Sequence, residues 1–127
     1  MPKSTYLNDS YINAGLRNTP FTSPTTVYVA LYTVTPGVGG GGTEVAGGAY
    51  ARQVATFVAP VNGVTSNTVD INFPVATLDW GTITSFALLD ASSGGNLMYF
   101  GNLSASRTVL TNDQVRFPTG QLFCQES

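Results

Sequence analysis

The sequence predicts a mainly β protein, an antiparallel β-sandwich or jelly-roll-like barrel of about seven to eight strands with a short N-terminal helix or arm. Runs rich in Val, Thr, Ile, Tyr and Phe recur along the chain, and clusters of Gly, Pro and Asn separate them. Only 9% of the residues are charged, too few for the exposed faces of a coiled coil or a long helical bundle. The 127 residues correspond to one domain, divided into a helix or arm with its connector (1–26) and a β domain (27–127).

The helix is expected over residues 4–15. Ser4 or Thr5 can cap its start, and Gly15 is expected to end it. We expect the helix to cover one end of the sheet, and the alternative is an extended arm that grips a neighbouring subunit. One face of the helix collects the side chains of Leu7, Tyr11 and Ala14.

The β pattern starts after an irregular connector (17–26) in which two prolines prevent a helix. The Asn62–Gly63 pair predicts a tight turn, and the Gly-rich loop 90–96 predicts a hairpin between the strands on either side of it. In the run 68–73, alternation places Val69, Ile71 and Phe73 on the buried face. Strands are expected at 27–34, 50–58, 68–73, 83–90, 97–103, 107–110, 114–117 and 121–125.

The residues present argue against an enzyme. The chain has no histidine and a single lysine, Lys3, so neither a Ser-His-Asp nor a Cys-His arrangement can be built within it. The carboxylates are spread through the sequence, a spacing that supports neither a glycosidase pair nor a calcium loop. We therefore expect no catalytic residue, no metal and no cofactor.

The charge balance and the apolar pattern exclude two classes of partner. A net charge of −2 without a basic block argues against nucleic-acid binding. No apolar run approaches the length of a membrane span, and the N-terminus does not resemble a secretory signal. The single Cys124 cannot form an intrachain disulfide and is expected to be a small buried residue. We expect a soluble protein made in a reducing cytoplasm.

Two motifs carry both a structural and a functional interpretation. The run 38–44 is rich in glycine but lacks the lysine of a phosphate loop, so we interpret it as a flexible connector that could also lie flat against a partner. Trp80 precedes a glycine at a strand start and is expected to anchor the core or its rim. The functional alternative for Trp80 is a platform on which a sugar stacks, together with Tyr99 and the loop 91–96.

The order of segments resembles a family of small structural proteins of tailed-bacteriophage virions, labelled tail fibre-like and similar in kind to capsid cement or decoration proteins. The resemblance extends from about Leu7 to Phe117, and its most specific part is Glu44-Val45 with Gly47-Gly48 and Tyr50-Ala51-Arg52. The other segments that carry it are 21–32, 73–77 with Trp80-Gly81, and 86–91 with 95–97.

The resemblance implies a non-enzymatic component of the virion, made in the cytoplasm of the bacterial host. We expect a capsid cement protein, a homotrimer that bridges capsomers of the major capsid protein. The alternative is a short tail fibre or baseplate protein that takes part in host attachment. Arg52 is expected to be buried and to hold a Gly-rich segment through a carboxylate or loop carbonyls. The candidate structural or interface residues are Arg52, Glu44, Trp80, Tyr50 and Tyr99.

Overall fold

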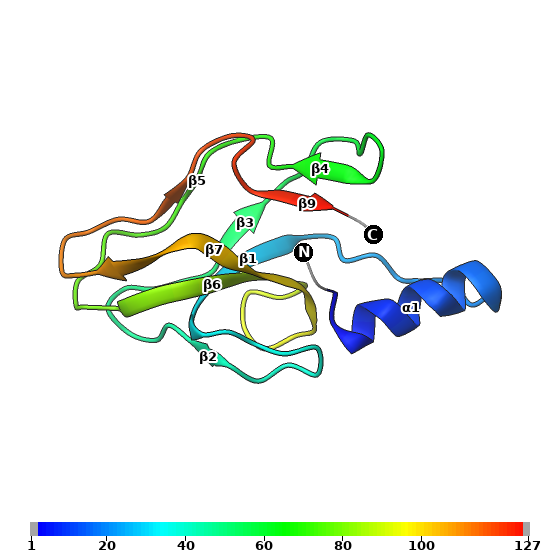
Figure 1. The fold of residues 1–127 in the computed structure, drawn as a ribbon, viewed down its shortest axis with the longest axis horizontal. Coiled ribbons are helices and arrows are strands. Elements are labelled where there is room, and N and C mark those ends of the chain that lie inside the picture. Colours follow the sequence, from blue (N-terminus) through cyan, green and yellow to red (C-terminus); the bar gives the residue numbers. More distant parts are fainter. Residues whose placement is uncertain (1–2, 126–127) are drawn as a thin grey trace.

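The structure, a computed structural model, describes residues 3–125, of which 123–125 are described by their backbone alone. One helix precedes a series of strands joined by loops (Figure 1). The elements are α1 (Thr5–Leu16), β1 (Val27–Val34), β2 (Thr43–Glu44), β3 (Gln53–Ala55), β4 (Val64–Ser66), β5 (Ile71–Asn72), β6 (Gly81–Leu89), β7 (Leu97–Val109), β8 (Arg116–Phe117) and β9 (Phe123–Gln125).

A five-stranded antiparallel sheet forms the centre of the molecule. Four of its strands lie in the order β2-β1-β6-β7, and the fifth is β3. β3 also pairs with β1, so β2 and β3 share the same edge of that strand at its two ends. β6 and β7 form the predicted hairpin, closed by the loop 90–96. This central hairpin and β1 supply the long apolar strands of the sequence.

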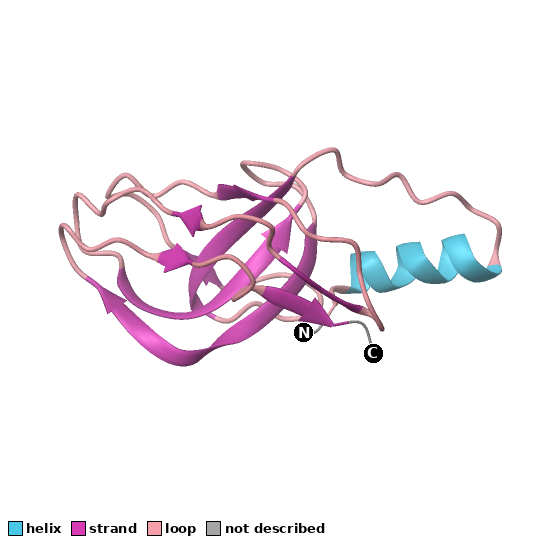
Figure 2. Ribbon diagram, turned by 90° about the horizontal axis from the view of Figure 1, so that it is seen from above, coloured by secondary structure: helices cyan, strands magenta, loops and turns pink. Residues whose placement is uncertain are grey.

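Two short ladders, β4–β9 and β5–β8, lie over one face of this sheet (Figure 2). Between the layers lies the larger core cluster, to which both the sheet and the covering segments contribute. The antiparallel sandwich predicted from the sequence is therefore confirmed. The most deeply buried residues of the larger core cluster include Val29, Leu31, Phe73, Ile83, Val109 and Leu122.

The opposite face of the sheet carries a second, smaller core. The glycine-rich loops 37–41 and 94–96 lie beside it, together with the start of α1. The first of these loops is held by a turn between Gly37 and Gly40, and its Val38 carbonyl accepts a hydrogen bond from the first residue of α1. Of the run 38–44, residues 38–42 are thus a connector, as interpreted from the sequence, and part of it is fixed against the helix, whereas Thr43 and Glu44 form β2. The second core consists of Ala30, Tyr32, Ala87, Leu89 and Phe100, with Leu97 packed against it.

The strand expected at 107–110 is not separate. It is the last part of β7, which pairs with the beginning of β6. The register shifts between the pairs Ile83–Arg107 and Ser85–Asn102, so that 103–106 bulge from the ladder. This bulge bends β7, and the sequence alternation on either side of it looks like two short strands.

Four other predicted strands are shorter in the structure, and two of them, 114–117 and 121–125, keep only β8 and β9. Of 50–58 only β3 remains, because the backbone at both ends of that run is held in loops. Of 68–73 only β5 remains, and Val69 is 58% exposed although Ile71 and Phe73 are buried as predicted. The prediction for Val69 was wrong because Asn67 is buried in its place and the chain turns between the two residues.

The predicted turn at Asn62–Gly63 is confirmed. Both residues have positive φ values, 53° and 78°, as a tight hairpin turn requires. The side chain of Cys124, for which the sequence predicts burial, lies outside the described residues.

The helix starts as predicted, with the Ser4 hydroxyl accepting a hydrogen bond from the Leu7 amide. It ends after Leu16 rather than at Gly15. Asn18 supplies the left-handed conformation that ends the helix, with φ of 54°. Asparagine adopts this conformation more readily than most residues, so glycine is not needed there.

The helix and its connector project beyond the strands (Figures 1 and 2). We call residues 5–26, which comprise α1 and the connector, the arm, and residues 27–125 the β body. Along α1 only Leu7 is buried, and most of the connector is exposed. The arm therefore meets the β body mainly at its base.

Candidate functional site

A partly buried ion pair joins two of the residues singled out from the sequence. Glu44 is the last residue of β2, and Arg52 immediately precedes β3. The loop that joins these two strands brings the two side chains together. The guanidinium of Arg52 donates from Nε to Oε2 and from Nη2 to Oε1 of Glu44, both at 2.9 Å. This two-point contact fixes the orientation of both side chains. Only 9% of the Arg52 side chain and 24% of the Glu44 side chain are exposed.

The remaining donors of Arg52 hold the hairpin loop between β6 and β7. Nη1 donates to the carbonyl oxygens of Ala91 and Gly94, at 2.8 and 2.9 Å. The sequence predicted a carboxylate or loop carbonyls as the partners of Arg52, and in the structure Arg52 binds both. The Gly-rich segment that Arg52 holds is the loop 91–94.

Tyr50 links the ion pair to the central sheet. Its hydroxyl donates to Oε2 of Glu44 at 2.6 Å and accepts a hydrogen bond from the backbone amide of Leu31 at 3.0 Å. Leu31 belongs to β1, so the network ties β2, the loop 50–52 and the hairpin loop to the middle of the sheet. It acts as a clamp on three segments far apart in the sequence. We call Glu44, Tyr50 and Arg52 the clamp.

The clamp changes the ionisation of its members. Burial alone would raise the pKa of Glu44, but hydrogen bonds from Arg52 and Tyr50 outweigh it and hold that pKa below its usual value. Burial, reinforced by the hydrogen bond to Glu44, raises the pKa of the Tyr50 hydroxyl. The hydrogen bonds to Glu44 raise the pKa of Arg52. At neutral pH the clamp is therefore an ionised carboxylate held by a guanidinium and a neutral phenol.

Trp80 packs beside the clamp and is a core residue. It is 5% exposed, its ring meets Tyr50 edge to face at 5.5 Å, and its Nε1 donates to the Gly48 carbonyl at 2.9 Å. Gly48 has φ of 59°, and a Cβ there would lie 2.8 Å from Trp80 Nε1. The anchoring role expected for Trp80 fits this environment, whereas a sugar could not stack on so deeply buried a ring.

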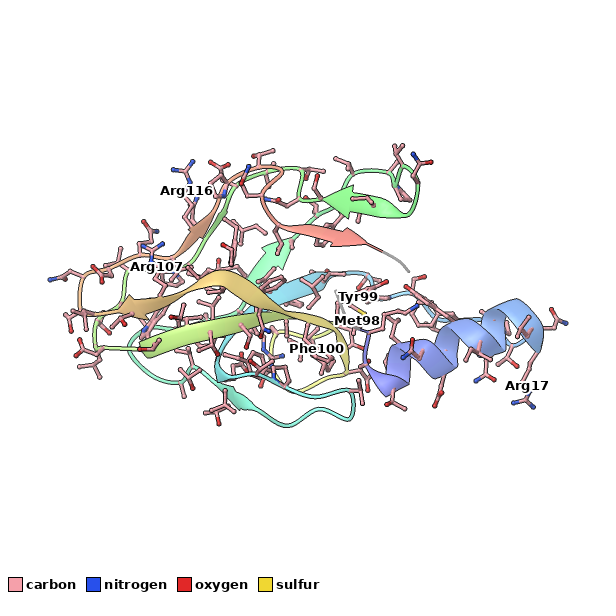
Figure 3. The ribbon with its side chains drawn as sticks, in the orientation of Figure 1. Arg17, Met98, Tyr99, Phe100, Arg107 and Arg116 are labelled. Atoms are coloured by element: carbon pink, nitrogen blue, oxygen red, sulfur yellow. The ribbon has the colours of Figure 1, made fainter. Side chains whose placement is uncertain are left out.

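Tyr99 lies apart from the clamp, on β7 where the arm meets the β body (Figure 3). Its hydroxyl is 3.4 Å from that of Tyr11 on α1, and the Tyr11 ring meets Phe21 edge to face at 5.7 Å. These aromatic rings line a largely apolar groove of about 480 Å³ between the arm and the β body. Its other walls include Leu7, Pro24, Val27, Phe57 and Met98.

The structure thus brings Glu44, Tyr50 and Arg52 together and places Trp80 against them. Tyr99 belongs to a different surface. Sequence reasoning missed Asn67, whose side chain is buried and holds the segment 117–122. Its Nδ2 donates to the Val69 carbonyl at 2.7 Å and its Oδ1 accepts from the Leu122 amide at 3.0 Å. An asparagine among turn residues gives no signal of such a role.

Four aspartates of the β body also hold loops. Each accepts a hydrogen bond from a backbone amide that a loop would otherwise leave unpaired. For Asp70 the hydrogen bonds from Thr119 lower the pKa, with a further contribution from Arg116. The pairs of carboxylate and backbone amide are Asp70–Thr119 (2.8 Å), Asp79–Thr111 (2.8 Å), Asp90–Asn96 (2.7 Å) and Asp113–Leu110 (3.0 Å).

The clamp and the aspartates form their hydrogen bonds with other groups of the same chain, and these hydrogen bonds hold loops in place. Within residues 3–125, no three side chains of the His, Cys, Asp or Glu type are grouped so that they could hold a metal ion. In the same range, no helix is long and apolar enough to cross a membrane.

Comparison with known protein families gives a match over most of the chain. The model of the family described as Podophage GP4 fiber I protein gp80 matches residues 2–125, nearly the whole chain. A search of the curated proteins finds no match.

Proposed function

This chain belongs to the family described as Podophage GP4 fiber I protein gp80, and on that premise we propose that it works by packing against neighbouring subunits of the phage particle. The match makes it a structural, tail fibre-like protein of a phage virion, as the resemblance in the sequence implied. We propose that it has no catalytic activity and needs no cofactor. Its partners in this proposal are further copies of itself, as a homotrimer, and other virion proteins.

The observation that carries the proposal is the use made of the few charged side chains. Glu44 and Arg52 are directed inward and clamp loops, and several aspartates cap backbone amides. What remains on the surface is mostly Thr, Ser, Asn, Gly and scattered apolar residues. Such a surface has little charge to repel a neighbour, and apolar contacts and hydrogen bonds can hold it in an assembly.

Two positions on the virion fit this role. As a cement protein, the chain would sit on the capsid and bridge capsomers of the major capsid protein, a position that its small size and low charge support. As a short fibre or baseplate protein, it would sit on the tail and take part in host attachment. The family is described as a fibre protein, which supports a virion component in either position.

A reconstruction of the complete virion by electron cryomicroscopy tests the proposal. Density for the β body on the particle is the expected result, and its absence from purified particles would overturn the proposal. Many copies on the shell would identify cement, whereas a few copies on the tail would identify a fibre or baseplate component.

Particles that lack the protein give a second, functional measurement. If it is cement, these particles should lose their DNA at a lower temperature or at low salt, with adsorption to the host unchanged. If it is a fibre protein, the heads should resist heat as well as wild-type heads do, and adsorption should fall. Particles unchanged in both respects would contradict both positions.

A further inference from the structure

The outer end of the arm exposes apolar side chains that the β body does not cover. Leu16, at the end of α1, is 83% exposed, the highest value among the large apolar side chains described. Ile12, one turn earlier, is 53% exposed. Both lie on the part of the molecule that projects beyond the strands (Figure 1). Because exposed apolar surface is unfavourable in water, contact with a partner would stabilise this pair of side chains.

The helix has two faces, and they differ in what they contact. Leu7 and Tyr11, four residues apart, face the β body, where Leu7 is buried and Tyr11 meets the Tyr99 hydroxyl. The other face, which we call the outer face, carries Asp9, Ile12 and Leu16 at spacings of three and four residues.

Charges flank the apolar pair on the outer face. Asp9 is exposed and precedes Ile12, and Arg17 follows Leu16 at the C-cap. The Arg17 guanidinium is held next to α1 by the side-chain oxygen of Asn13, at 3.2 Å from Nη1. Arg17 lies at the far tip of the arm in Figure 3. The outer face therefore has a negative end, an apolar centre and a positive end.

We propose that the outer face pairs with the outer face of α1 from a second copy of this chain, with the two helices antiparallel. A two-fold axis then brings both copies of Ile12 and Leu16 into one apolar cluster and places Asp9 of each helix near Arg17 of the other. A parallel pairing would instead align like charges. A surface that complements itself under a two-fold rotation is what a symmetric pair of identical chains requires.

The size of α1 agrees with this pairing. Isolated helices of twelve residues are marginal in water, and the β body stabilises mainly the first turns of this one. Contact with a second helix would stabilise the outer turns. The buried area is small, so the pair should be weak between free chains and effective where many copies stand together. Pairing of free chains does not depend on the position on the virion, so this inference goes beyond the proposed function.

Sedimentation equilibrium of the full chain over a wide concentration range tests the pairing. The wild type should show a reversible two-fold pairing step, of monomers into dimers or of homotrimers into larger assemblies, and Leu16→Asp should abolish that step while the helical circular dichroism is kept. Leu78→Asp is the matched control, because Leu78 is 64% exposed but lies in the β body, before Trp80. A pairing step that persists in Leu16→Asp, or a wild type that shows no pairing step at the highest concentration, overturns the proposal.

A charge exchange tests the antiparallel geometry itself. Asp9→Arg and Arg17→Asp should each weaken self-association by about tenfold, because two like-charge contacts replace two ion pairs. An equimolar mixture of the two variants should associate as the wild type does, since positions 9 and 17 of one chain then face positions 17 and 9 of the other with opposite charges. If the mixture is as weak as either variant alone, the outer faces do not pair in this way.

Discussion

The β body and the arm use their polar and apolar side chains in opposite ways. In the β body, Arg52 is almost fully buried and binds a carboxylate and two carbonyl oxygens. In the arm, Arg17 is exposed and binds one side chain, that of Asn13. The large apolar residues differ too: the β body buries a core of them, whereas on α1 only Leu7 is buried and Leu16 is 83% exposed. A chain with few charges can thus use them to fix its shape and leave apolar groups for contact.

The largest effect expected from breaking this comparison is on the clamp. Arg52→Ala should lower the free energy of unfolding by about 3 kcal/mol, because it leaves Glu44 partly buried without its partner and frees the loop carbonyls. The value lies at the lower end for a buried pair, since 24% of the Glu44 side chain keeps contact with water. Urea unfolding followed by tryptophan fluorescence measures it, since Trp80 packs against Tyr50 of the clamp.

Arg116 provides the matched control within the same β body. It forms an ion pair with Asp70 at 2.7 Å, but 56% and 39% of the two side chains are exposed. Because water screens an exposed pair, Arg116→Ala should leave the unfolding midpoint close to that of the wild type. Equal losses in the two variants would mean that burial does not set the strength of the clamp.

The sequence predicts part of the structure of the β body and of its clamp. The sandwich and the hairpin around 90–96 could be predicted, because alternation and turn residues are local signals. For Arg52 the sequence predicted burial but left its partner open between a carboxylate and loop carbonyls. The ends of β3 could not be predicted, because Tyr50 and Arg52 leave the strand to make contacts with residues distant in the sequence. For the same reason no local signal marked Asn67.

The helix shows the same limit on a smaller scale. Its start follows from Ser4, whose hydroxyl caps the helix as the residue type predicts. Its end does not follow from Gly15, because Asn18 can adopt the left-handed conformation that the chain needs there. Two competing stop signals within a few residues leave the boundary open until the chain is folded.

A smaller effect is expected when one glycine is replaced by alanine in each of the two regions. Gly48→Ala should destabilise the β body by about 2 kcal/mol, because alanine disfavours positive φ and its Cβ would collide with the Trp80 ring. Gly15→Ala should instead stabilise the arm, by up to about 1 kcal/mol, because Gly15 lies within α1 and a Cβ there would meet no atom within 4 Å.

Two probes separate these effects. Thermal unfolding followed by Trp80 fluorescence reports on the β body and should show a lower midpoint for Gly48→Ala alone. Amide hydrogen exchange along α1 reports on the arm and should slow in Gly15→Ala. A lower fluorescence midpoint in Gly15→Ala would show that the arm and the β body unfold as one unit and not as two separate regions.

The smallest effect expected is the pH dependence that the clamp gives to the β body. The pKa of Glu44 is lower in the folded chain than in the unfolded chain, so the clamp contributes stability above the unfolded value, about 4.3. That contribution should be lost as the pH falls through the lower pKa of the folded state. Urea midpoints measured between neutral pH and about pH 3 should therefore decrease toward the acid end.

Glu44→Gln isolates this contribution from that of the other carboxylates. The variant should be less stable than the wild type at neutral pH, because Arg52 is then partly buried beside an uncharged group. Its urea midpoint should change less with pH, and the decrease that remains should come from Asp70, whose pKa is also lowered. If wild type and variant lose stability in parallel as the pH falls, Glu44 is not the group whose protonation loosens the loops.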